Sequence, residues 1–276
     1  MRTAVALVVL VGCTGAEPEP TEGSLLALTY NVQGLPDALS DSPRPTADRM
    51  VDIAPLLDAY DVVGLQETFD EDWHALLTAE ATHPIRAWTS DRRDDAVYSA
   101  GLGLLSRVGT DVGYDELFYS QCHGTLDGSG DCLATKGLQI QSLQLADGAV
   151  LDVVNTHHEA GGGPEDEAAR ASQVAEAIAA LDPSHAVLFM GDTNLRPSDP
   201  PDAVLLAEYA DAGLIDACTA VGCDETDHID RFFVRSSDAL ELTVDAWSRP
   251  LEFVDADGED LSDHPPISVQ ISWQVR

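Results

Sequence analysis

Short apolar runs separated by polar residues recur along the chain, and their spacing predicts which segments are strands. Runs in which apolar residues are continuous, or alternate with polar ones, are typical of β-strands. The last run is a clear case, because Ile267, Val269, Ile271 and Trp273 occupy every second position. By this criterion we expect strands at residues 25–32, 61–66, 102–106, 137–145, 150–154, 186–190, 228–234 and 266–273.

Three longer segments have the apolar spacing of a helix instead. In the first of them, Met50, Ile53 and Leu57 fall on one helical face. We expect helices at residues 47–60, 165–181 and 202–212. Many strands with few long helices favour two packed sheets flanked by helices over a strictly alternating parallel sheet. We see no internal repeat and no boundary after residue 24, so residues 25–276 are expected to form one domain.

The first 24 residues differ from the rest in composition. Residues 1–12 combine Arg2 with a short apolar run, which predicts a signal peptide that is too short to span a bilayer. Leu-Val-Gly-Cys ends at Cys13 and resembles a bacterial lipobox, in which this cysteine becomes acylated and tethers the protein to a membrane. A plain secretory signal or a misplaced start are the alternatives. Residues 13–24 are rich in Pro, Glu and Gly and predict a flexible tether.

The net charge of the chain restricts which kinds of molecule it can bind. The chain has 14 basic and 49 acidic residues, a formal net charge of −35, and a single lysine, Lys136. Such a surface repels polyanions, because nucleic-acid affinity comes largely from Lys and Arg neutralising phosphates. The composition therefore disfavours nucleic acid as a partner and leaves small, neutral or zwitterionic phosphate compounds open.

The cysteines fit an exported protein. If Cys13 carries lipid, four cysteines remain, an even number that suggests disulfides in an oxidising compartment. Three pairings are open, and proximity in the sequence favours Cys122 with Cys132 and Cys218 with Cys223. We expect export to a bacterial cell envelope, either as a membrane-anchored lipoprotein or as a secreted protein.

Polar residues at the ends of the predicted strands are the candidates for chemistry. These residues are Asn31, Glu67, His157, His158, Asp192 and Asn194 after strands, and Asp230, Asp263 and His264 before strands. Their carboxylate and amide oxygens suit a hard cation such as Mg²⁺ (or Mn²⁺), and histidine can move protons near neutral pH. No cysteine lies in these segments, which argues against zinc or thiol chemistry there.

The motifs that carry these residues occur in a recognisable order. The segments TYNVQG, LQET, GLGLLSR, NTHH, GDTN, IDRFFV and SDHPPI follow one another between residues 25 and 273. In this order they resemble the endonuclease/exonuclease/phosphatase superfamily. The resemblance implies the deoxyribonuclease-I-like fold, an α/β (α+β) four-layer sandwich of two packed mixed β-sheets flanked by helices. It also implies a metal-dependent phosphoric ester hydrolase.

The resemblance gives each candidate a role. It implies that Glu67 is the principal metal ligand, with Asn31 and Asp263 at or beside the metal. Asp192 and Asn194 resemble the pair that contacts the attacking water and the phosphate. His264 resembles the catalytic histidine, and Asp230 resembles the carboxylate that orients it. His157 resembles the histidine that stabilises charge on the phosphoryl group. Whether Asp192 or His264 takes the proton from water stays open, and His158 could exchange roles with its neighbour.

One branch of the superfamily is the most similar. Cys122 followed by Asp-Cys-Leu-Ala-Thr-Lys-Gly at residues 131–137 resembles a segment of bacterial sphingomyelinases and related phospholipases C. By this resemblance Lys136 and Arg170 are candidates for substrate binding. We therefore expect an exported, monomeric, metal-dependent phosphodiesterase that hydrolyses a lipid headgroup or other small phosphodiester by direct attack of an activated water. The alternatives are a secreted nuclease of the same fold, with a basic groove, and a non-catalytic surface lipoprotein.

Overall fold

The computed structural model describes residues 20–276, apart from residues 41, 126–129 and 226. The predicted signal peptide, Cys13 and the first part of the predicted tether lie outside the described residues. The end of the predicted tether differs from the structure, because Glu22, Gly23 and Ser24 already pair with the last strand. Trp273 packs so closely over Gly23 that a Cβ atom there would lie 2.6 Å from its ring, which explains why the second residue of β1 is a glycine.

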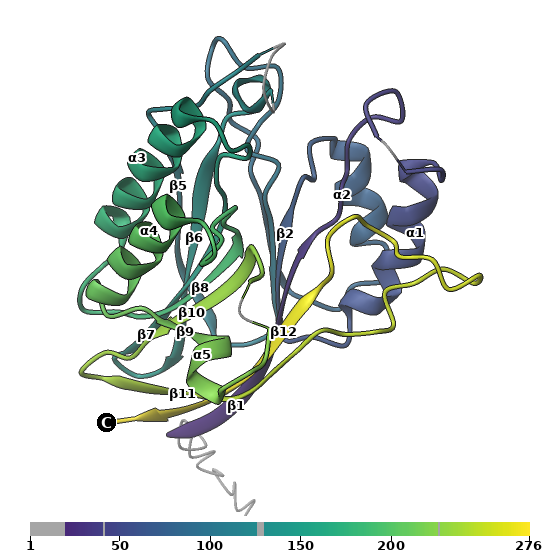
Figure 1. The fold of residues 1–276 in the computed structure, drawn as a ribbon. Coiled ribbons are helices and arrows are strands. Elements are labelled where there is room, and N and C mark those ends of the chain that lie inside the picture. Colours follow the sequence, from purple (N-terminus) through teal and green to yellow (C-terminus); the bar gives the residue numbers. More distant parts are fainter. Residues whose placement is uncertain (1–19, 41, 126–129, 226) are drawn as a thin grey trace, which may run out of the picture.

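Two six-stranded sheets form the centre of the molecule (Figure 1). The first sheet has the order β11-β12-β1-β2-β4-β3 and the second has the order β5-β6-β7-β8-β10-β9. The strands of the first sheet are β1 Glu22–Asn31, β2 Val62–Gln66, β3 Ile85–Trp88, β4 Gly103–Ser106, β11 Leu240–Ser248 and β12 Ile267–Val275. Those of the second are β5 Thr110–Phe118, β6 Gly137–Ala146, β7 Ala149–His157, β8 Ala186–Asp192, β9 Ile215–Asp216 and β10 Asp230–Arg235.

Helices cover the outer faces of the two sheets. Figure 1 shows α1 and α2 against the first sheet and α3 and α4 against the second. The helices are α1 Thr46–Leu57, α2 Glu71–Leu77, α3 Pro164–Ala180, α4 Pro200–Asp211 and α5 Ala217–Val221, with one 3₁₀ turn, η1, at Asp131–Leu133. Three apolar clusters result: one between the sheets, one under α1 and one under α3 and α4. This arrangement confirms the predicted four-layer sandwich.

Parallel strand pairs near the centre of each sheet decide where the polar strand ends meet. β1 and β2 are parallel in the first sheet, and β7 and β8 are parallel in the second. All four strands therefore end at one rim of the sandwich, where they deliver Asn31, Glu67, His157 and Asp192. Short connections after strands at such a rim are a common location for functional side chains.

The cysteines pair as nearest neighbours. Disulfides join Cys122 to Cys132 and Cys218 to Cys223, so the pairing favoured by proximity is confirmed. Cys132 lies in η1, shortly before β6, and the second bridge joins α5 to the residue just after its left-handed cap, Gly222. Among the residues that the structure describes, no helix has the length and apolar character needed to cross a membrane.

Close packing of the two sheets depends on Gly64 of β2. A Cβ atom added there would lie 2.8 Å from the buried Met190 sulfur and 3.1 Å from Asn155 Oδ1, both on the opposite sheet. We expect Gly64→Ala to lower the free energy of unfolding by about 1 to 3 kcal/mol, because the extra methyl group overpacks the interface. Urea unfolding followed by circular dichroism measures this change.

Gly162→Ala is the matched control for this substitution. Gly162 is exposed, and an added Cβ would meet nothing within 4 Å. Its stability should stay within about 0.5 kcal/mol of the wild type, as for most surface substitutions. Equal stability of the two variants would show that the sheets can separate to admit a methyl group.

Candidate functional site

Strand register brings three of the predicted residues into one row across the second sheet. Asp192 of β8 lies opposite Asp230 of β10 and opposite His157 of β7. Residues in such a row point to the same face of a sheet, so their side chains are neighbours without any loop having to place them. On the other sheet, Asn31 of β1 pairs with Gln66, the residue before Glu67.

The carboxylate of Asp192 is the centre of the group. Its Oδ2 atom accepts a hydrogen bond of 3.1 Å from Asn31 Nδ2 and lies 3.4 Å from His157 Nε2 and 3.7 Å from His264 Nε2. The other oxygen accepts the backbone N–H of Asn194 at 3.1 Å, which is the Asx turn usual for this sequence. One oxygen therefore builds the turn, and the other faces an amide and two imidazoles.

Asn31 joins the two sheets at this point. Its Nδ2 donates to Glu67 Oε1 at 3.0 Å as well as to Asp192, and its Oδ1 accepts the Gln33 N–H at 3.0 Å. The amide thus offers hydrogens, rather than its oxygen, to the two carboxylates. Half a turn of the amide would present the oxygen instead, at the cost of the bond from Gln33. A metal-ligand role for Asn31 stays a prediction.

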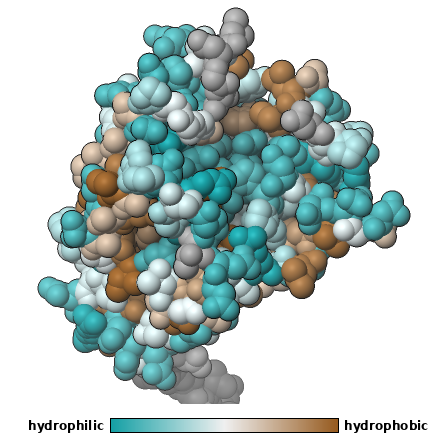
Figure 2. Space-filling model, in the orientation of Figure 1, coloured by the Kyte–Doolittle hydropathy of each residue, from teal (hydrophilic) through white to brown (hydrophobic). Residues whose placement is uncertain are grey.

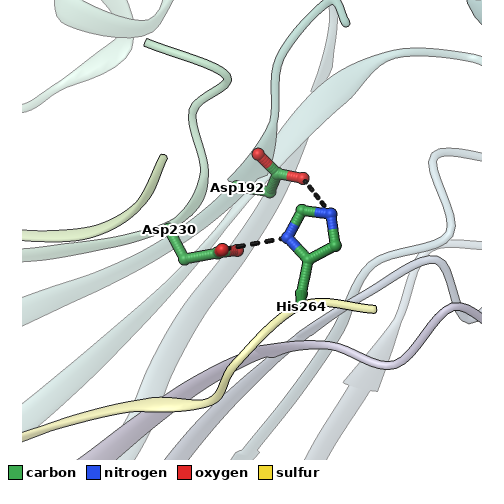
Figure 3. A group of neighbouring side chains, drawn as sticks. All are labelled: Asp192, Asp230 and His264. Atoms are coloured by element: carbon green, nitrogen blue, oxygen red, sulfur yellow. Dashed lines mark hydrogen bonds and ion pairs between the residues drawn. The ribbon is translucent and has the colours of Figure 1, made fainter. Parts of the chain in front are cut away.

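His264 lies between two carboxylates (Figure 3). Its Nδ1 is 2.9 Å from Asp230 Oδ2, and its Nε2 faces Asp192. Burial lowers the pKa of His264, but the hydrogen bond that it donates to Asp230 and the negative charges of Asp230, Asp192 and Asp263 outweigh burial and raise this pKa to about 10. Burial and the charge of Asp192 raise the pKa of Asp230 to about 6. The pair accordingly keeps a proton on the imidazole near neutral pH.

The two adjacent histidines have different surroundings: His157 lies at the site, and His158 is buried in the core beside it. His157 Nε2 faces Asp192, and its Nδ1 has no hydrogen-bond partner among the described residues. His158 is fully buried and contacts the Tyr209 hydroxyl at 2.7 Å through Nε2. Burial, with the positive charge of Lys136, moves the pKa of His157 well below its ordinary value. His157 is therefore the uncharged histidine of the site.

Two residues of the site have an unusual backbone. Glu67 has a φ of 60° and Asn194 a φ of 52°, in the left-handed region that side chains other than glycine rarely adopt. Asn194 also donates through Nδ2 to the His158 carbonyl at 3.2 Å, which supports its conformation. Such strain is concentrated at functional sites, where the surrounding structure holds it in place.

The SDH segment is fastened by a residue that the motif analysis did not single out. Ser262 Oγ donates to the Asn31 carbonyl at 2.7 Å and accepts the His264 N–H at 3.3 Å. This serine therefore connects His264 to the end of β1. Asp263 is exposed, and its Oδ1 lies 3.3 Å from Ser262 Oγ. Its predicted place at or beside a metal stays a prediction.

The structure treats the two predicted substrate-binding residues differently. Lys136 is buried beside the site, where its Nζ lies 2.7 Å from Asp131 Oδ1 and donates to the His158 carbonyl at 3.0 Å. Arg170 is not at the site. Its guanidinium is buried, pairs with Asp202 at 3.0 Å, and donates to the carbonyls of residues 159–161. It braces the loop after β7, so the predicted substrate contact of Arg170 has no support in the geometry.

A pocket of about 320 Å³ adjoins this group. Glu67, Lys136 and His157 form its polar end. The rest of the wall is largely apolar and includes Leu35, Leu39, Phe69, Tyr98 and Leu133. Figure 2 shows a largely hydrophilic surface across the middle of the molecule between the two helical layers, with apolar patches beside it. The pocket can thus hold a charged group beside a compact apolar one.

The donor atoms here fit a divalent cation. The buried Oε2 of Glu67 has no hydrogen-bond partner among the residues that the structure describes, and burial raises the pKa of Glu67. A nearby cation would relieve both penalties. Asp192, Asp230 and His264 also offer ligand atoms within 4.8 Å of one another, but there the imidazole already lies between the two carboxylates. Glu67 is therefore the better candidate for the principal ligand.

Comparison with known proteins agrees with this geometry. Residues 28–264 match the model of the Endonuclease/Exonuclease/phosphatase family. A sphingomyelinase from Mycobacterium bovis is 30% identical over 280 residues, which cover 92% of this chain and 54% of that protein. This chain therefore spans about half the length of the curated relatives it matches.

Solved structures show the same fold. Sphingomyelinase C from Streptomyces griseocarneus has a TM-score of 0.65 and 21% identity, with 90% of this chain and 99% of that chain covered. D. rerio TDP2 complexed with a single-strand DNA product has a TM-score of 0.66 and 20% identity, with 90% and 98% covered. The family match extends over most of the chain, from β1 to His264. The chain belongs to the endonuclease/exonuclease/phosphatase family.

Proposed function

We propose that this chain is a divalent-metal-dependent phosphodiesterase that hydrolyses a lipid headgroup or other small phosphodiester by direct attack of an activated water. The observation that carries the proposal is the environment of Asp192 Oδ2, which faces an amide and two imidazoles. Glu67 shares that amide and lines the adjoining pocket. A carboxylate, a protonated histidine and a neutral one within reach of one phosphate are suited to acid–base catalysis of ester hydrolysis.

The residues divide the work as follows. His264 holds a proton and is oriented by Asp230, so Asp192 is the group free to take the proton from the attacking water. His157 offers an uncharged N–H to a phosphoryl oxygen, and Asn194 follows in the same turn as Asp192. A Mg²⁺ or Mn²⁺ ion held by Glu67, with Asn31 and Asp263 beside it, would supply positive charge to the phosphate oxygens.

The surface and the relatives support a small or lipid substrate. The net charge of −35 opposes a polyanion, and the pocket wall is largely apolar beyond its polar end. The Mycobacterium bovis relative is a sphingomyelinase, and so is the Streptomyces griseocarneus neighbour. A phosphodiester that joins a compact headgroup to an apolar chain satisfies both features.

Export, lipid attachment at Cys13 and a monomeric state belong to the same proposal. Two disulfides support an oxidising compartment, because such bonds are rare in reducing ones. A membrane tether would place the enzyme beside lipid substrates. Mass spectrometry of the mature N-terminus tests the attachment, since an unmodified cysteine there would remove the tether from the proposal.

A substrate panel tests the function directly. We expect purified protein to hydrolyse sphingomyelin or phosphatidylcholine with Mg²⁺ or Mn²⁺, and to lose this activity in EDTA, because Glu67 then has no cation beside it. Inositol phosphates and plasmid DNA are the other members of the panel. The products measured are phosphocholine from the lipids, inorganic phosphate from the inositol phosphates and cleaved strands from the DNA. Hydrolysis that persists in EDTA would contradict metal dependence, and inactivity together with failure to bind Mg²⁺ would favour a non-catalytic lipoprotein.

A nuclease is the second candidate, because a structural neighbour is complexed with a single-strand DNA product. A nuclease of this fold would need a basic groove, for which Arg92, Arg93 and Arg196 are the candidates. Arg92 donates to the Val97 carbonyl, and Arg93 pairs with Asp95. Plasmid degradation at low salt that exceeds lipid hydrolysis would establish the nuclease. The absence of degradation would exclude it.

Two substitutions test the site itself. Glu67→Gln and His264→Ala should each lower kcat at least about a hundredfold, because the first removes the charged ligand and the second the proton held near Asp192. Steady-state kinetics on the best substrate measures this loss. His185→Ala is the control: His185 pairs with Asp152 at the far end of β8, and its kcat should equal that of the wild type.

The proton on His264 has a measurable pH dependence. Its folded pKa of about 10 lies above the ordinary 6.5, so its contribution to stability is fully present below pH 6.5 and is lost as pH rises through about 10. In EDTA-treated protein, NMR titration should find this imidazole charged at pH 7.5. Asp230→Asn should lower the midpoint, because it removes the strongest group that raises the pKa. An unchanged midpoint would show that Asp230 does not hold the proton.

A further inference from the structure

Two motif residues at this rim lie one or two positions before site residues and contact each other. Gln66 belongs to LQET and Asn155 belongs to NTHH, and both side chains are fully buried. Gln66 Nε2 donates to Asn155 Oδ1 at 2.7 Å. Gln66 lies on β2 of the first sheet and Asn155 on β7 of the second, so this bond crosses the interface between the sheets.

Asn155 also bonds the backbone of the opposite sheet. Its Nδ2 faces the carbonyls of Leu65 at 2.9 Å and Gly103 at 3.0 Å, and Gln139 Oε1 at 3.1 Å. Leu65 and Gly103 are register partners on the adjacent strands β2 and β4, so one side chain from β7 is hydrogen-bonded to both strands. These contacts fix the position of β7 along the first sheet as well as its distance from it.

The junction extends to β1 through Gln66. Its Nε2 also donates to Thr29 Oγ1 at 3.0 Å, so Thr29, Gln66 and Asn155 link three strands. Each of the three stands one or two positions from a site residue: Asn31, Glu67 and His157, respectively. A shift at the junction would therefore move ligands on one sheet relative to the acid–base groups on the other.

Polar groups here have a physical reason to control register. The surrounding interface is apolar, and apolar contact is non-directional, so it resists separation of the sheets better than sliding. Hydrogen bonds in a buried setting are directional and costly to leave unmade. Gln66 Oε1 has no hydrogen-bond partner within the described part of the chain. This position therefore carries a buried amide even though one of its polar atoms is unsatisfied.

We propose that Asn155, together with Gln66, is a positioning residue that sets the offset between the two sheets and with it the gap between Glu67 and the pair Asp192 and His157. This inference rests on the proposed function, because the gap matters only if a cation and a phosphate occupy it. Neither side chain touches substrate. Their effect passes through the strand ends that follow them.

The test compares Asn155→Leu, Gln66→Leu and the double variant. We expect Asn155→Leu to weaken Mg²⁺ binding, measured by isothermal titration calorimetry, and to lower kcat, each by about tenfold to a hundredfold, as for residues that support metal ligands. KM should change much less than kcat. The effects of the two single variants should fail to add in the double variant, because the pair acts as one unit. Gln66→Leu keeps the bonds between Asn155 and the backbone of the first sheet. It is therefore the variant to measure if Asn155→Leu does not fold.

Gln141→Leu separates positioning from simple core stability. Gln141 is a buried amide on β6 that bonds Asp111 and the Gly113 carbonyl at the edge of the second sheet. It should lose stability but keep wild-type kcat and Mg²⁺ affinity. An Asn155→Leu protein that is less stable yet binds Mg²⁺ and turns over like wild type would overturn the inference while leaving the proposed function intact. A wild-type protein with neither activity nor Mg²⁺ binding would instead overturn both.

Discussion

One amide group holds together charges that would otherwise repel. Glu67 and Asp192 come from different sheets, and both accept hydrogens from Asn31 Nδ2. The charge of Asp192 helps to raise the pKa of Glu67, after the larger effect of burial, and like charges this close destabilise a fold unless hydrogen bonds or a cation offset them. The strand packing brings the carboxylates together, and the amide makes the approach tolerable. The site is therefore a product of the sandwich, because neither sheet contains both acids.

On the proposed function, the balance of charge around this amide favours a cation beside an anionic substrate. Lys136 is already paired with Asp131, and His264 lies between Asp230 and Asp192. A phosphodiester would meet carboxylates whose local positive partners are engaged, in a chain of net charge −35. A divalent ion beside Glu67 would reverse the local sign without altering the rest of the surface. The same charges disfavour a long polyanion, which would contact acidic surface well beyond the site.

The sequence predicted the fold where the periodicity was regular and failed where it was interrupted. β12 alternates without a break, whereas β11 was missed because a bulge between Val244 and Ala246 shifts its alternation. β5 was missed because most of its residues are exposed on both faces. The motifs predicted which residues gather at the rim, and the structure brings Asp192, Asp230, His157 and His264 together. They could not reveal that Arg170 turns into the loop after β7, since burial and direction depend on the packing of α3 against α4.

The motifs also contain residues that face the opposite sheet and not the pocket. In LQET the glutamate faces the pocket and Gln66 faces the other sheet, and in NTHH the first histidine faces Asp192 while Asn155 faces β2 and β4. Gln66 and Glu67 are adjacent, so their side chains diverge at the end of β2, whereas Asn155 and His157 are two positions apart and share one face of β7. On the proposed function, a short motif at a strand end therefore contains both a site residue and a residue that bonds its strand to the opposite sheet. Because the motifs contain residues that join the two sheets as well as residues of the site, their order along this chain indicates both the fold and the site of the family.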